Sequence, residues 1–401
     1  MFFLGLMSGT SLDGIDAAII ELKAKDSHRH WNCTLVGGLT SPWCPSLRKK
    51  LLHLCKSQAS ISIDELGYLD AQTGIAFAQA ANTLINRVGL ANSNIQAIGS
   101  HGQTIRHRPN SSPPFSMQIG DPHRIAEITG ITTVSDFRRR DIAAGGQGAP
   151  LMPAFHHAML GNSHEDRAVV NLGGIANLTL LPAHGALIGF DCGTANTLLD
   201  CWHSLHHSDE LFDQDGKWAA SGKIHTELLE LLVNDAWFSL PPPKSTGPEY
   251  FNLDWLSERT RKWQDLRPED VQATLVELSV VTISNALKNL QPSTKILYVA
   301  GGGCHNAYMM NQLNKQISDI HVKPISAIGL DPDYFEAMGF AWLAAQTLMN
   351  IPVNLTSVTG AIGARILGSI HLGHEKNCFK LFRIVAHTTL WARSVGKFLK
   401  H

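Results

Sequence analysis

Apolar runs separated by glycine-rich turns dominate the pattern of this chain. Runs at 2–6 and 17–20 flank a turn rich in Gly, Ser and Thr, which predicts a β-hairpin. The pattern restarts at 167–172 and 175–181 around a Gly-Gly turn, which predicts a second hairpin. Strands that alternate with helices and a repeated hairpin indicate a duplicated α/β architecture, with a cleft between two lobes.

Helical spacing adds several long elements to the two hairpins. Ser62 and Glu65 have the spacing of a capping box, and apolar residues follow at helical intervals as far as Val88. Proline at a first helical position predicts helices that begin at Pro122 and Pro268. The other expected elements are strands at 95–99, 131–135, 186–188 and 296–300, and helices from Asn196, near 305–313 and over 334–349.

The glycine-rich segment 143–148 has no hydrophobic periodicity, and we expect it to be a hinge near a lobe boundary. The expected N-terminal lobe covers 1–145 and is joined by a returning segment at about 350–373. The expected C-terminal lobe covers 146–349.

Composition restricts the class of protein. A chain of 401 residues suits two domains or one large bilobal unit, and 44% hydrophobic with 17% charged residues is typical of a soluble globular protein. A net charge of −1 gives no support for nucleic-acid binding. Seven cysteines without paired spacing indicate reduced thiols, hence a cytoplasmic enzyme. We expect neither a signal peptide nor a membrane span.

The turn of the first hairpin has the composition of a phosphate-binding loop. Gly9 and Gly14 permit a positive φ, and backbone N–H groups with hydroxyls would form an anion-binding concavity. Asp13 and Asp16 add carboxylates, and Asp13 is the residue expected to hold Mg²⁺, directly or through water. The nucleotide-binding residues expected here are Gly9, Thr10, Ser11, Leu12, Asp13, Gly14, Ile15 and Asp16.

Three further glycine-rich elements occur at 145–148, 171–174 and 301–303. Each alone predicts only a tight turn. Two phosphate hairpins followed by a strand, three glycines and a helix resemble the actin, Hsp70 and sugar-kinase superfamily. In that superfamily the two loops bracket the β- and γ-phosphates and the third element packs on adenosine. The resemblance adds Gly173, Gly174, Gly301, Gly302 and Gly303 to the expected ATP site.

A closer resemblance extends in order from Gly5 to about Gly368. The segments GLMSGTSLDGIDAA, IGSHGQTIRH, DFRRRDIAAGGQGAPL, NLGGIANL, GFDCGTAN, KSTG and AGGGCHN are similar to the anhydro-N-acetylmuramic acid kinase family. The resemblance implies a two-lobed, duplicated actin-like (ribonuclease H-like) fold and a homodimer. It also implies ATP-dependent conversion of 1,6-anhydro-N-acetylmuramic acid and water to N-acetylmuramic acid 6-phosphate, in peptidoglycan recycling.

Asp191 is the expected catalytic base. It follows the expected strand at 186–188 and precedes the helix from Asn196, so its carboxylate could activate a water in a cleft. An N-cap of that helix explains an aspartate here equally well. The resemblance favours catalysis, because the family's base matches this aspartate.

Glu336 is the second expected catalytic carboxylate. Its place in the first turn of the last helix also suits complementation of the helix dipole. The resemblance implies that it helps to hold the attacking water and the sugar. Ser100, His101 and Gln103, in a loop expected after the strand at 95–99, are assigned to the sugar site.

The arginine run at 138–140 lies in a polar turn flanked by aspartates. Arg140 matches a substrate-contacting arginine of the family. Arg138 and Arg139 are expected to pair with Asp136 and Asp141.

Histidines and the tail carry weaker signals. Twenty histidines are present, but the clusters at 156–157 and 203–207 lack the spacing of a zinc site and are expected to be core or surface residues. The tail at 374–401 has six Lys and Arg residues against Glu375 and a net charge of +5. A solvated extension is favoured over contact with a membrane surface.

Two carboxylates near an anomeric carbon are typical of inverting glycoside hydrolysis, in which one activates water. We therefore expect Asp191 to deprotonate water while the departing O6 attacks the γ-phosphate. A kinase of an ordinary hexose would need no such water. A sugar sensor or actin-like ATPase is a third reading, and the presence of Asp13, Asp191 and Glu336 disfavours it.

Overall fold

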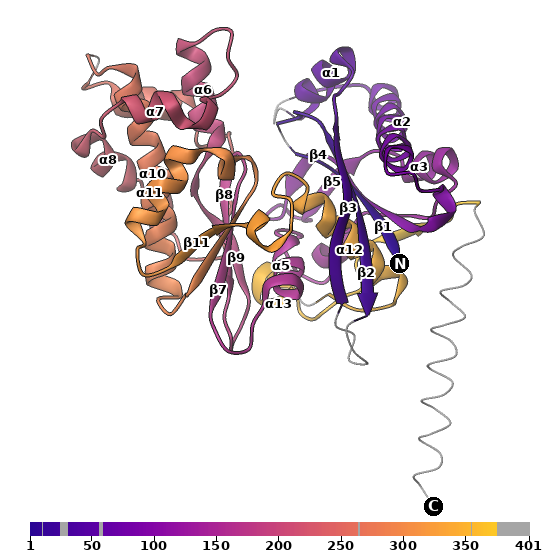
Figure 1. Cartoon of the computed structure of the whole chain (residues 1–401). Helices are drawn as coiled ribbons and strands as arrows, with labels where there is room; N and C mark the ends of the chain where they lie inside the picture. Colours follow the sequence, from indigo (N-terminus) through magenta and orange to yellow (C-terminus); the bar gives the residue numbers. More distant parts are fainter. Residues whose placement is uncertain (10, 25–30, 56–58, 264, 354, 375–401) are drawn as a thin grey trace, which may run out of the picture. The chain divides into compact units, whose positions relative to one another are not determined.

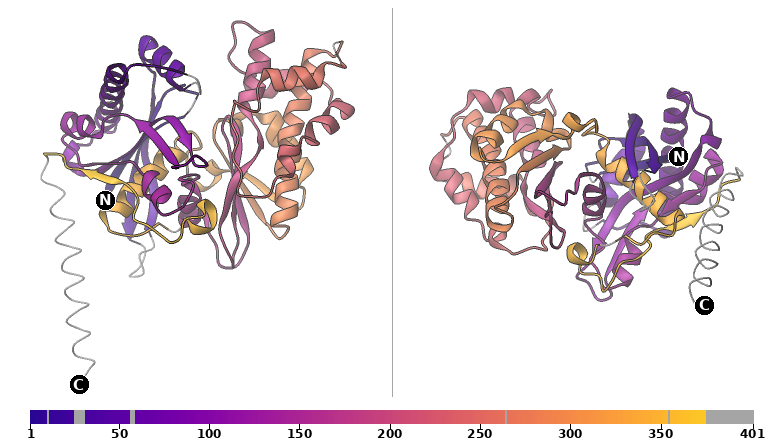
Figure 2. Two further views of the ribbon diagram at one scale, coloured as in Figure 1. Left: turned by 180° about the vertical axis from the view of Figure 1, so that it is seen from behind. Right: turned by 60° about the horizontal axis from the view of Figure 1, so that its bottom comes forward.

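A computed structural model describes residues 1–9, 11–24, 31–55, 59–263, 265–353 and 355–374. The chain divides into two compact units, one of Met1–Phe155 with the chain from Glu336, the other of His156–Phe335. In Figures 1 and 2 each unit has its own sheet surrounded by its own helices. The divisions fall at Phe155/His156 and Phe335/Glu336, instead of after 145 and 349.

Helix α12 (Phe335–Leu348) explains the shift of the second division. A Cβ on Gly5 would lie 1.7 Å from the carbonyl oxygen of Ala337, and one on Gly99 would lie 2.0 Å from that of Phe340. The helix thus lies directly on the strands that carry the two glycines. It was expected in the C-terminal lobe, and it belongs to the first unit.

The first unit contains a seven-stranded sheet in the order β12-β6-β4-β1-β2-β3, with β5 beside β4. Strands β1, β2 and β3 form an antiparallel meander, and β4 lies parallel to β1 on its other side. The strands are β1 (Phe2–Ser8), β2 (Ile15–Ala24), β3 (Trp31–Ser41), β4 (Ile95–Arg108), β5 (Phe115–Ile119), β6 (Thr133–Ser135) and β12 (Ser369–His371).

Helix α2 (Ile63–Arg87) covers the face of this sheet opposite α12, where Phe77 and Leu84 pack with apolar strand residues. The expected cap is confirmed, because Ser62 Oγ accepts a hydrogen bond from the Glu65 N–H at 3.0 Å. The other helices that begin in this unit are α1 (Pro45–Cys55), η1 (Asn92–Asn94), α3 (Pro122–Thr129), α4 (Arg139–Ala143), α5 (Met152–Leu160) and α13 (Thr356–Thr359).

The second unit repeats the strand pattern of the first in a five-stranded sheet, ordered β11-β10-β7-β8-β9. Strands β7, β8 and β9 form the antiparallel meander, and β10 lies parallel to β7. This repetition confirms the duplicated α/β fold. The strands are β7 (Arg167–Leu172), β8 (Ile175–Leu181), β9 (Ile188–Thr194), β10 (Ile296–Ala300) and β11 (His321–Pro324).

Helix α10 (Pro268–Leu290) supplies much of the second core, since Leu275, Leu278 and Ile283 pack with the sheet. The remaining helices of this unit are α6 (Asn196–His206), η2 (Gln214–Gly216), α7 (Lys217–Ser221), α8 (Thr226–Val233), η3 (Ala236–Ser239), α9 (Leu253–Thr260), η4 (Gly302–His305), α11 (Ala307–Gln316) and η5 (Ile325–Ile328).

Two expected strand ends are wrong. Strand β4 does not stop at Gly99, and Ser100, His101 and Gln103 lie within it instead of in a loop. Gly102 takes φ = +74°, which lets the strand bend and continue against β5. Asp191 does not follow a strand but lies inside β9, opposite Asn177 of β8.

The expected hinge at 143–148 lies inside the first unit and is tied down. Asp141 Oδ2 accepts a hydrogen bond from the Gly148 N–H at 2.7 Å, and Thr359 Oγ1 donates to Asp141 Oδ1 at 2.8 Å. Within the described residues, no helix is both long and apolar enough to cross a membrane. The prediction of a solvated tail concerns residues 374–401, of which only His374 is among the described residues.

Candidate active site

The turn between β1 and β2 is a compact loop, but its left-handed residue is not a glycine. Leu12 has φ = 56°, its N–H donates to the Gly9 carbonyl at 3.2 Å, and its side chain is fully buried. Gly9 and Gly14, which permit a positive φ, are not among the described residues that take one. Burial of the leucine side chain holds this backbone conformation. Thr10 lies outside the described residues.

Side chains of α1, β4 and the end of β1 donate hydrogen bonds to the carbonyls of this loop. Arg48 of α1 donates from Nε to the Leu12 carbonyl at 2.7 Å, and Gln103 donates to the Gly9 carbonyl at 3.3 Å. Ser8 Oγ donates to the Gly14 carbonyl at 2.9 Å. Gln103 thus contacts the loop at 9–16, whereas sequence reasoning assigned it to the sugar. Nothing in the sequence pattern marked Arg48.

The carboxylates of the loop suit a magnesium ion bound together with nucleotide phosphates. The Asp13 side chain is 80% exposed and lies 4.0 Å from Arg48, and Asp16 accepts a hydrogen bond from Thr40 Oγ1 at 2.7 Å. Among the described residues, no group of three or more His, Cys, Asp or Glu could hold a metal ion. Mg²⁺ usually takes one or two carboxylates and completes its shell with phosphate oxygens and water. Asp13 fits that arrangement.

The loops at 9–16, 171–174 and 301–303 each contain a glycine with no room for a side chain and a glycine with open space beside it. A Cβ on Gly174 would lie 2.2 Å from the Thr197 hydroxyl, and one on Gly303 would lie 2.5 Å from the Leu172 side chain. Gly14 is similarly pressed against β3. A Cβ on the open glycines would meet no atom closer than 3.6 Å, and these are Gly9, Gly173 and Gly302. The open positions leave backbone accessible to a ligand.

Arg138 is the centre of a polar cluster on the α12 side of the first unit. Its Nε and one terminal nitrogen lie 3.1 and 2.9 Å from Nε2 of His101, and the other terminal nitrogen donates to the Gly148 carbonyl at 2.8 Å. Burial, followed by the charge of Arg138, lowers the pKa of His101 well below its ordinary value. His101 is therefore neutral and accepts from Arg138 through Nε2.

Glu336 is the carboxylate of this cluster. It lies in the first turn of α12, as expected, and is half-buried. Burial raises the pKa of Glu336, the charge of Arg138 lowers it, and Asp16 raises it. Burial likewise lowers the pKa of Arg138 to about 10, against the opposing effect of Glu336 and Asp141. A desolvated carboxylate beside a buried cation is a common arrangement at functional sites.

The neighbouring arginines and Ser100 are placed as follows. Arg139 pairs with Asp136 at 2.7 Å, as expected. Arg138 donates to His101 and Gly148, and the importance of this arginine was missed. Arg140 is exposed and forms no hydrogen bond or ion pair with the described residues, so its contact with substrate stays a prediction. Ser100 is buried, and its Oγ has no partner in the described part of the chain.

Asp191 is held at the free edge of the second sheet. Its Oδ1 accepts a hydrogen bond from Asn177 Nδ2 at 2.9 Å, and its Oδ2 accepts one from the Thr246 N–H at 2.9 Å. Its own N–H donates to the Lys244 carbonyl at 3.1 Å. The N-cap of α6 is Ala195, which excludes the capping role for Asp191.

The surroundings of Asp191 suit a proton acceptor. Burial raises the pKa of this carboxyl, the hydrogen bonds from Asn177 and Thr246 lower it, Glu249 raises it and Lys244 lowers it. The net direction is upward, and a raised pKa makes a carboxylate a stronger base.

The third glycine element opens a helix, as expected. Gly301 has φ = +77° and donates to the Pro332 carbonyl at 3.2 Å, and η4 and α11 follow. The histidines at 203 and 207 stack at 4.4 Å beside Trp218 and are packing residues.

Comparisons with known proteins agree with one another. A family model described as "Anhydro-N-acetylmuramic acid kinase" matches residues 1–373. The chain is 58% identical to an anhydro-N-acetylmuramic acid kinase of Xylella fastidiosa, over 92% of this chain and 96% of that protein. The enzyme of the same name from Coxiella burnetii is 44% identical over 94% of this chain and 98% of that protein.

A solved ROK family glucokinase from Streptomyces griseus is 13% identical over 86% of this chain and 100% of that chain, with a TM-score of 0.38, too weak a likeness to carry an argument. The family model and the close relatives carry the assignment instead. This chain belongs to the anhydro-N-acetylmuramic acid kinase family.

Proposed function

We propose that this kinase opens the ring of 1,6-anhydro-N-acetylmuramic acid with water and phosphorylates O6 in one coupled reaction, with Asp191 as the base. The environment of Asp191 carries the proposal. Two donors orient the Asp191 carboxylate, and burial of the carboxylate raises its pKa. A carboxylate in this state can take a proton from water near neutral pH.

The bonds and protons balance as follows. The water oxygen forms a bond to the anomeric carbon, and its proton passes to Asp191. The bond between the anomeric carbon and O6 breaks, and its electron pair stays on O6. O6 then takes the γ-phosphoryl group from ATP, and ADP leaves. No acid is needed to protonate O6, because the phosphoryl group replaces the proton.

Each unit contains residues assigned to the proposed reaction. The first unit supplies the loop at 9–16 and the cluster of Glu336, Arg138 and His101. Glu336 would hold the water and the sugar, and Arg138 would keep Glu336 ionised and in place. The second unit supplies Asp191, the phosphate turn at 173–174 and the adenosine element at 301–303.

ATP is the proposed phosphoryl donor, bound with Mg²⁺ on the side of Asp13. The ion would neutralise charge on the transferring phosphates. The open glycines Gly9, Gly173 and Gly302 support close approach of the nucleotide to the backbone. Arg48, 4.0 Å from Asp13, adds a positive charge beside the same loop.

We also propose a cytoplasmic homodimer. The six described cysteines are unpaired, in keeping with a reducing compartment. The homodimer follows from the family resemblance alone, and light scattering during gel filtration tests it: a mass of one chain would contradict it.

An acceptor comparison tests the proposed function. The purified protein is incubated with ATP and Mg²⁺ and either 1,6-anhydro-N-acetylmuramic acid or ring-opened N-acetylmuramic acid. We expect N-acetylmuramic acid 6-phosphate from the anhydro sugar, with one ADP formed per product. Rapid phosphorylation of the open sugar with no turnover of the anhydro sugar would identify an ordinary hexose kinase instead.

A further inference from the structure

The segment at 244–246 holds the free edge of β9 at the position of Asp191. β9 is the last strand of its sheet, so one side of its backbone lies outside the ladder. Lys244 accepts the Asp191 N–H through its carbonyl, and Thr246 donates its N–H to the Asp191 carboxylate. The position of Asp191 therefore depends on where this short segment is held.

The Lys244 side chain anchors one end of the segment. Its ammonium donates to the carbonyls of Trp237 and Phe238 at 3.3 and 2.9 Å, and it lies 4.3 Å from the centre of the Trp237 ring. Burial lowers the pKa of Lys244 from its ordinary value, and the charge of Asp191 opposes this shift. The two carbonyl acceptors and the aromatic face also favour the protonated form of the lysine. The half-buried ammonium is thus held in place by Trp237 and Phe238 while it acts electrostatically on Asp191.

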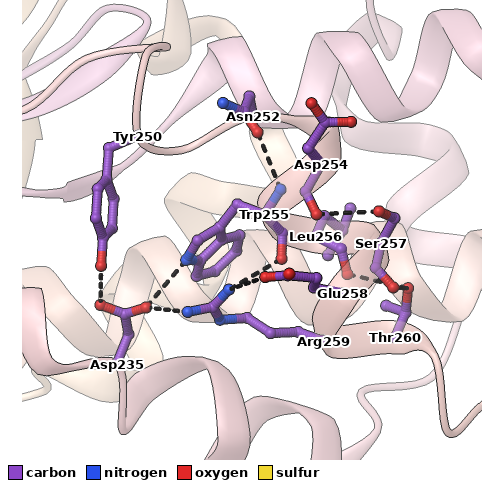
Figure 3. A network of polar contacts seen from close by, with 10 residues as sticks. All are labelled: Asp235, Tyr250, Asn252, Asp254, Trp255, Leu256, Ser257, Glu258, Arg259 and Thr260. Carbon is purple, nitrogen blue, oxygen red and sulfur yellow. Dashed lines mark hydrogen bonds and ion pairs between the residues drawn. The ribbon is translucent and has the colours of Figure 1, made fainter.

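A buried carboxylate anchors the helical turn to which Lys244 is tied. Asp235 accepts hydrogen bonds from the Trp237 N–H at 2.9 Å, Tyr250 Oη at 2.8 Å and Trp255 Nε1 at 3.0 Å, and it also pairs with Arg259. Figure 3 shows Tyr250, Trp255 and Arg259 converging on this carboxylate from the chain after the 244–246 segment. We call Asp235, Trp237, Tyr250, Trp255 and Arg259 the Asp235 network. It fixes both flanks of the segment, through η3 on one side and Tyr250 on the other.

We propose that Lys244 is a positioning residue for the reaction, which holds the 244–246 segment against β9 and places a fixed positive charge beside the Asp191 carboxylate. The inference rests on the proposed function, since it assigns Lys244 a role through Asp191. Lys244 touches neither the reacting atoms nor the nucleotide in this account.

The charges around Asp191 give the proposal a signature that a purely structural lysine would lack. Lys244 and Glu249, five residues apart, act on the Asp191 carboxyl in opposite directions, the lysine lowering its pKa and the glutamate raising it. The neighbouring Cys192 thiol has a pKa raised by burial and is uncharged. From β8, Asp191 faces the neutral amide of Asn177.

The test compares pH profiles of kcat/KM for the anhydro sugar. The acid limb of the profile, where kcat/KM falls as Asp191 becomes protonated, moves to higher pH by about half a unit in Lys244→Met. This is the size expected for one charge across a partly hydrated site. The same variant lowers kcat about tenfold, because the segment loses its anchor. Lys244→Arg keeps the charge and restores the limb. Glu249→Gln moves the limb in the opposite direction.

Lys217→Met is the matched control, because Lys217 lies in the same unit, is exposed and pairs only with Asp215 at 3.0 Å among the described acids. Its profile should equal that of the unaltered enzyme. If Lys244→Met does not fold, Lys244→Gln carries the test, because its amide still donates but has no charge. An acid limb that stays in place in the uncharged variants overturns the inference.

Failure of the inference and failure of the proposed function give different results. If Asp191→Asn is inactive while the limb of Lys244→Met is unmoved, Asp191 remains the base and the role of Lys244 is wrong. If Asp191→Asn turns over normally, the base assignment itself is wrong and the inference falls with it.

Discussion

Two aspartates of the second unit, Asp191 and Asp235, are both removed from bulk water, yet their environments have opposite effects. Asp235 accepts from four donors, and although burial alone would raise its pKa, these hydrogen bonds and Arg259 hold it below the ordinary value. Among the described residues, the Asp191 carboxylate accepts from two donors, the Asn177 amide and the Thr246 N–H, and burial raises its pKa. A carboxylate with all its lone pairs satisfied is a structural anchor, whereas one left partly unsatisfied retains affinity for a proton.

The strongest test of this contrast is Asp191→Asn. An amide cannot take a proton from water, so kcat should fall about 1,000-fold, within the range for loss of a general base. Nucleotide binding should be retained, as measured by titration calorimetry with a non-hydrolysable ATP analogue, and the circular dichroism spectrum should be that of the folded protein. Near-normal turnover would remove Asp191 from the chemistry.

Asp235→Asn should show the reverse pattern. Loss of the buried charge leaves Arg259 without its partner, and the free energy of unfolding should fall by about 3 kcal/mol. Urea denaturation followed by tryptophan fluorescence measures this change. The control is Asp254→Asn, an exposed aspartate of α9, which should cost little. Equal stability of the Asp235 and Asp254 variants would show that the Asp235 network is not an anchor.

Glu336→Gln tests whether the carboxylate of the first unit acts like Asp191 or supports it. Because we assign Glu336 to holding water and sugar, kcat/KM for the sugar should fall about 10- to 100-fold, with the KM for ATP unchanged. A loss as large as that of Asp191→Asn, with an altered acid limb, would instead make Glu336 a second proton-transfer group.

Lowering the pH should affect activity through Asp191 before it affects stability through Asp235. We expect this effect to be smaller than those of the three substitutions. Activity needs ionised Asp191, so kcat/KM is lost as pH falls through its raised pKa, above the ordinary 3.8. The stability supplied by Asp235 is present above its unfolded pKa and is lost only as pH falls towards its lowered folded pKa. The free energies of unfolding of the unaltered protein and of Asp235→Asn, measured between pH 3 and 6, should become equal only below about pH 4. Convergence already at pH 6 would contradict the assignment.

Sequence reasoning identified what depends on local pattern. The bounds of β7, β8 and β10 equal the predicted ranges, and Glu336 lies in the helical turn where it was expected. The contacts of Arg138 and the proposed role of Lys244 were not predicted, although the KSTG segment that contains Lys244 was recognised as a family signature. Arg138 contacts a histidine 37 positions away, and Asp191 meets Thr246 across 55 positions. Such contacts are set by the sheet topology and not by spacing along the chain.

The same limit explains the errors. Gly9 and Gly14 permit the left-handed conformation in the first loop, but Leu12, whose side chain is buried, is the described residue there that takes it. Burial is a tertiary property, and local composition does not reveal it. For the same reason α12 was assigned to the wrong unit, because only its close packing on Gly5 and Gly99 shows where it belongs.

Turnover in ¹⁸O-water tests the central claim most directly. The enzyme is given 1,6-anhydro-N-acetylmuramic acid and ATP, and the product is analysed at once by mass spectrometry with fragmentation. We expect one ¹⁸O at the anomeric hydroxyl and an unlabelled O6 that carries the phosphoryl group. Label on the phosphate or O6 with none at the anomeric carbon would contradict it.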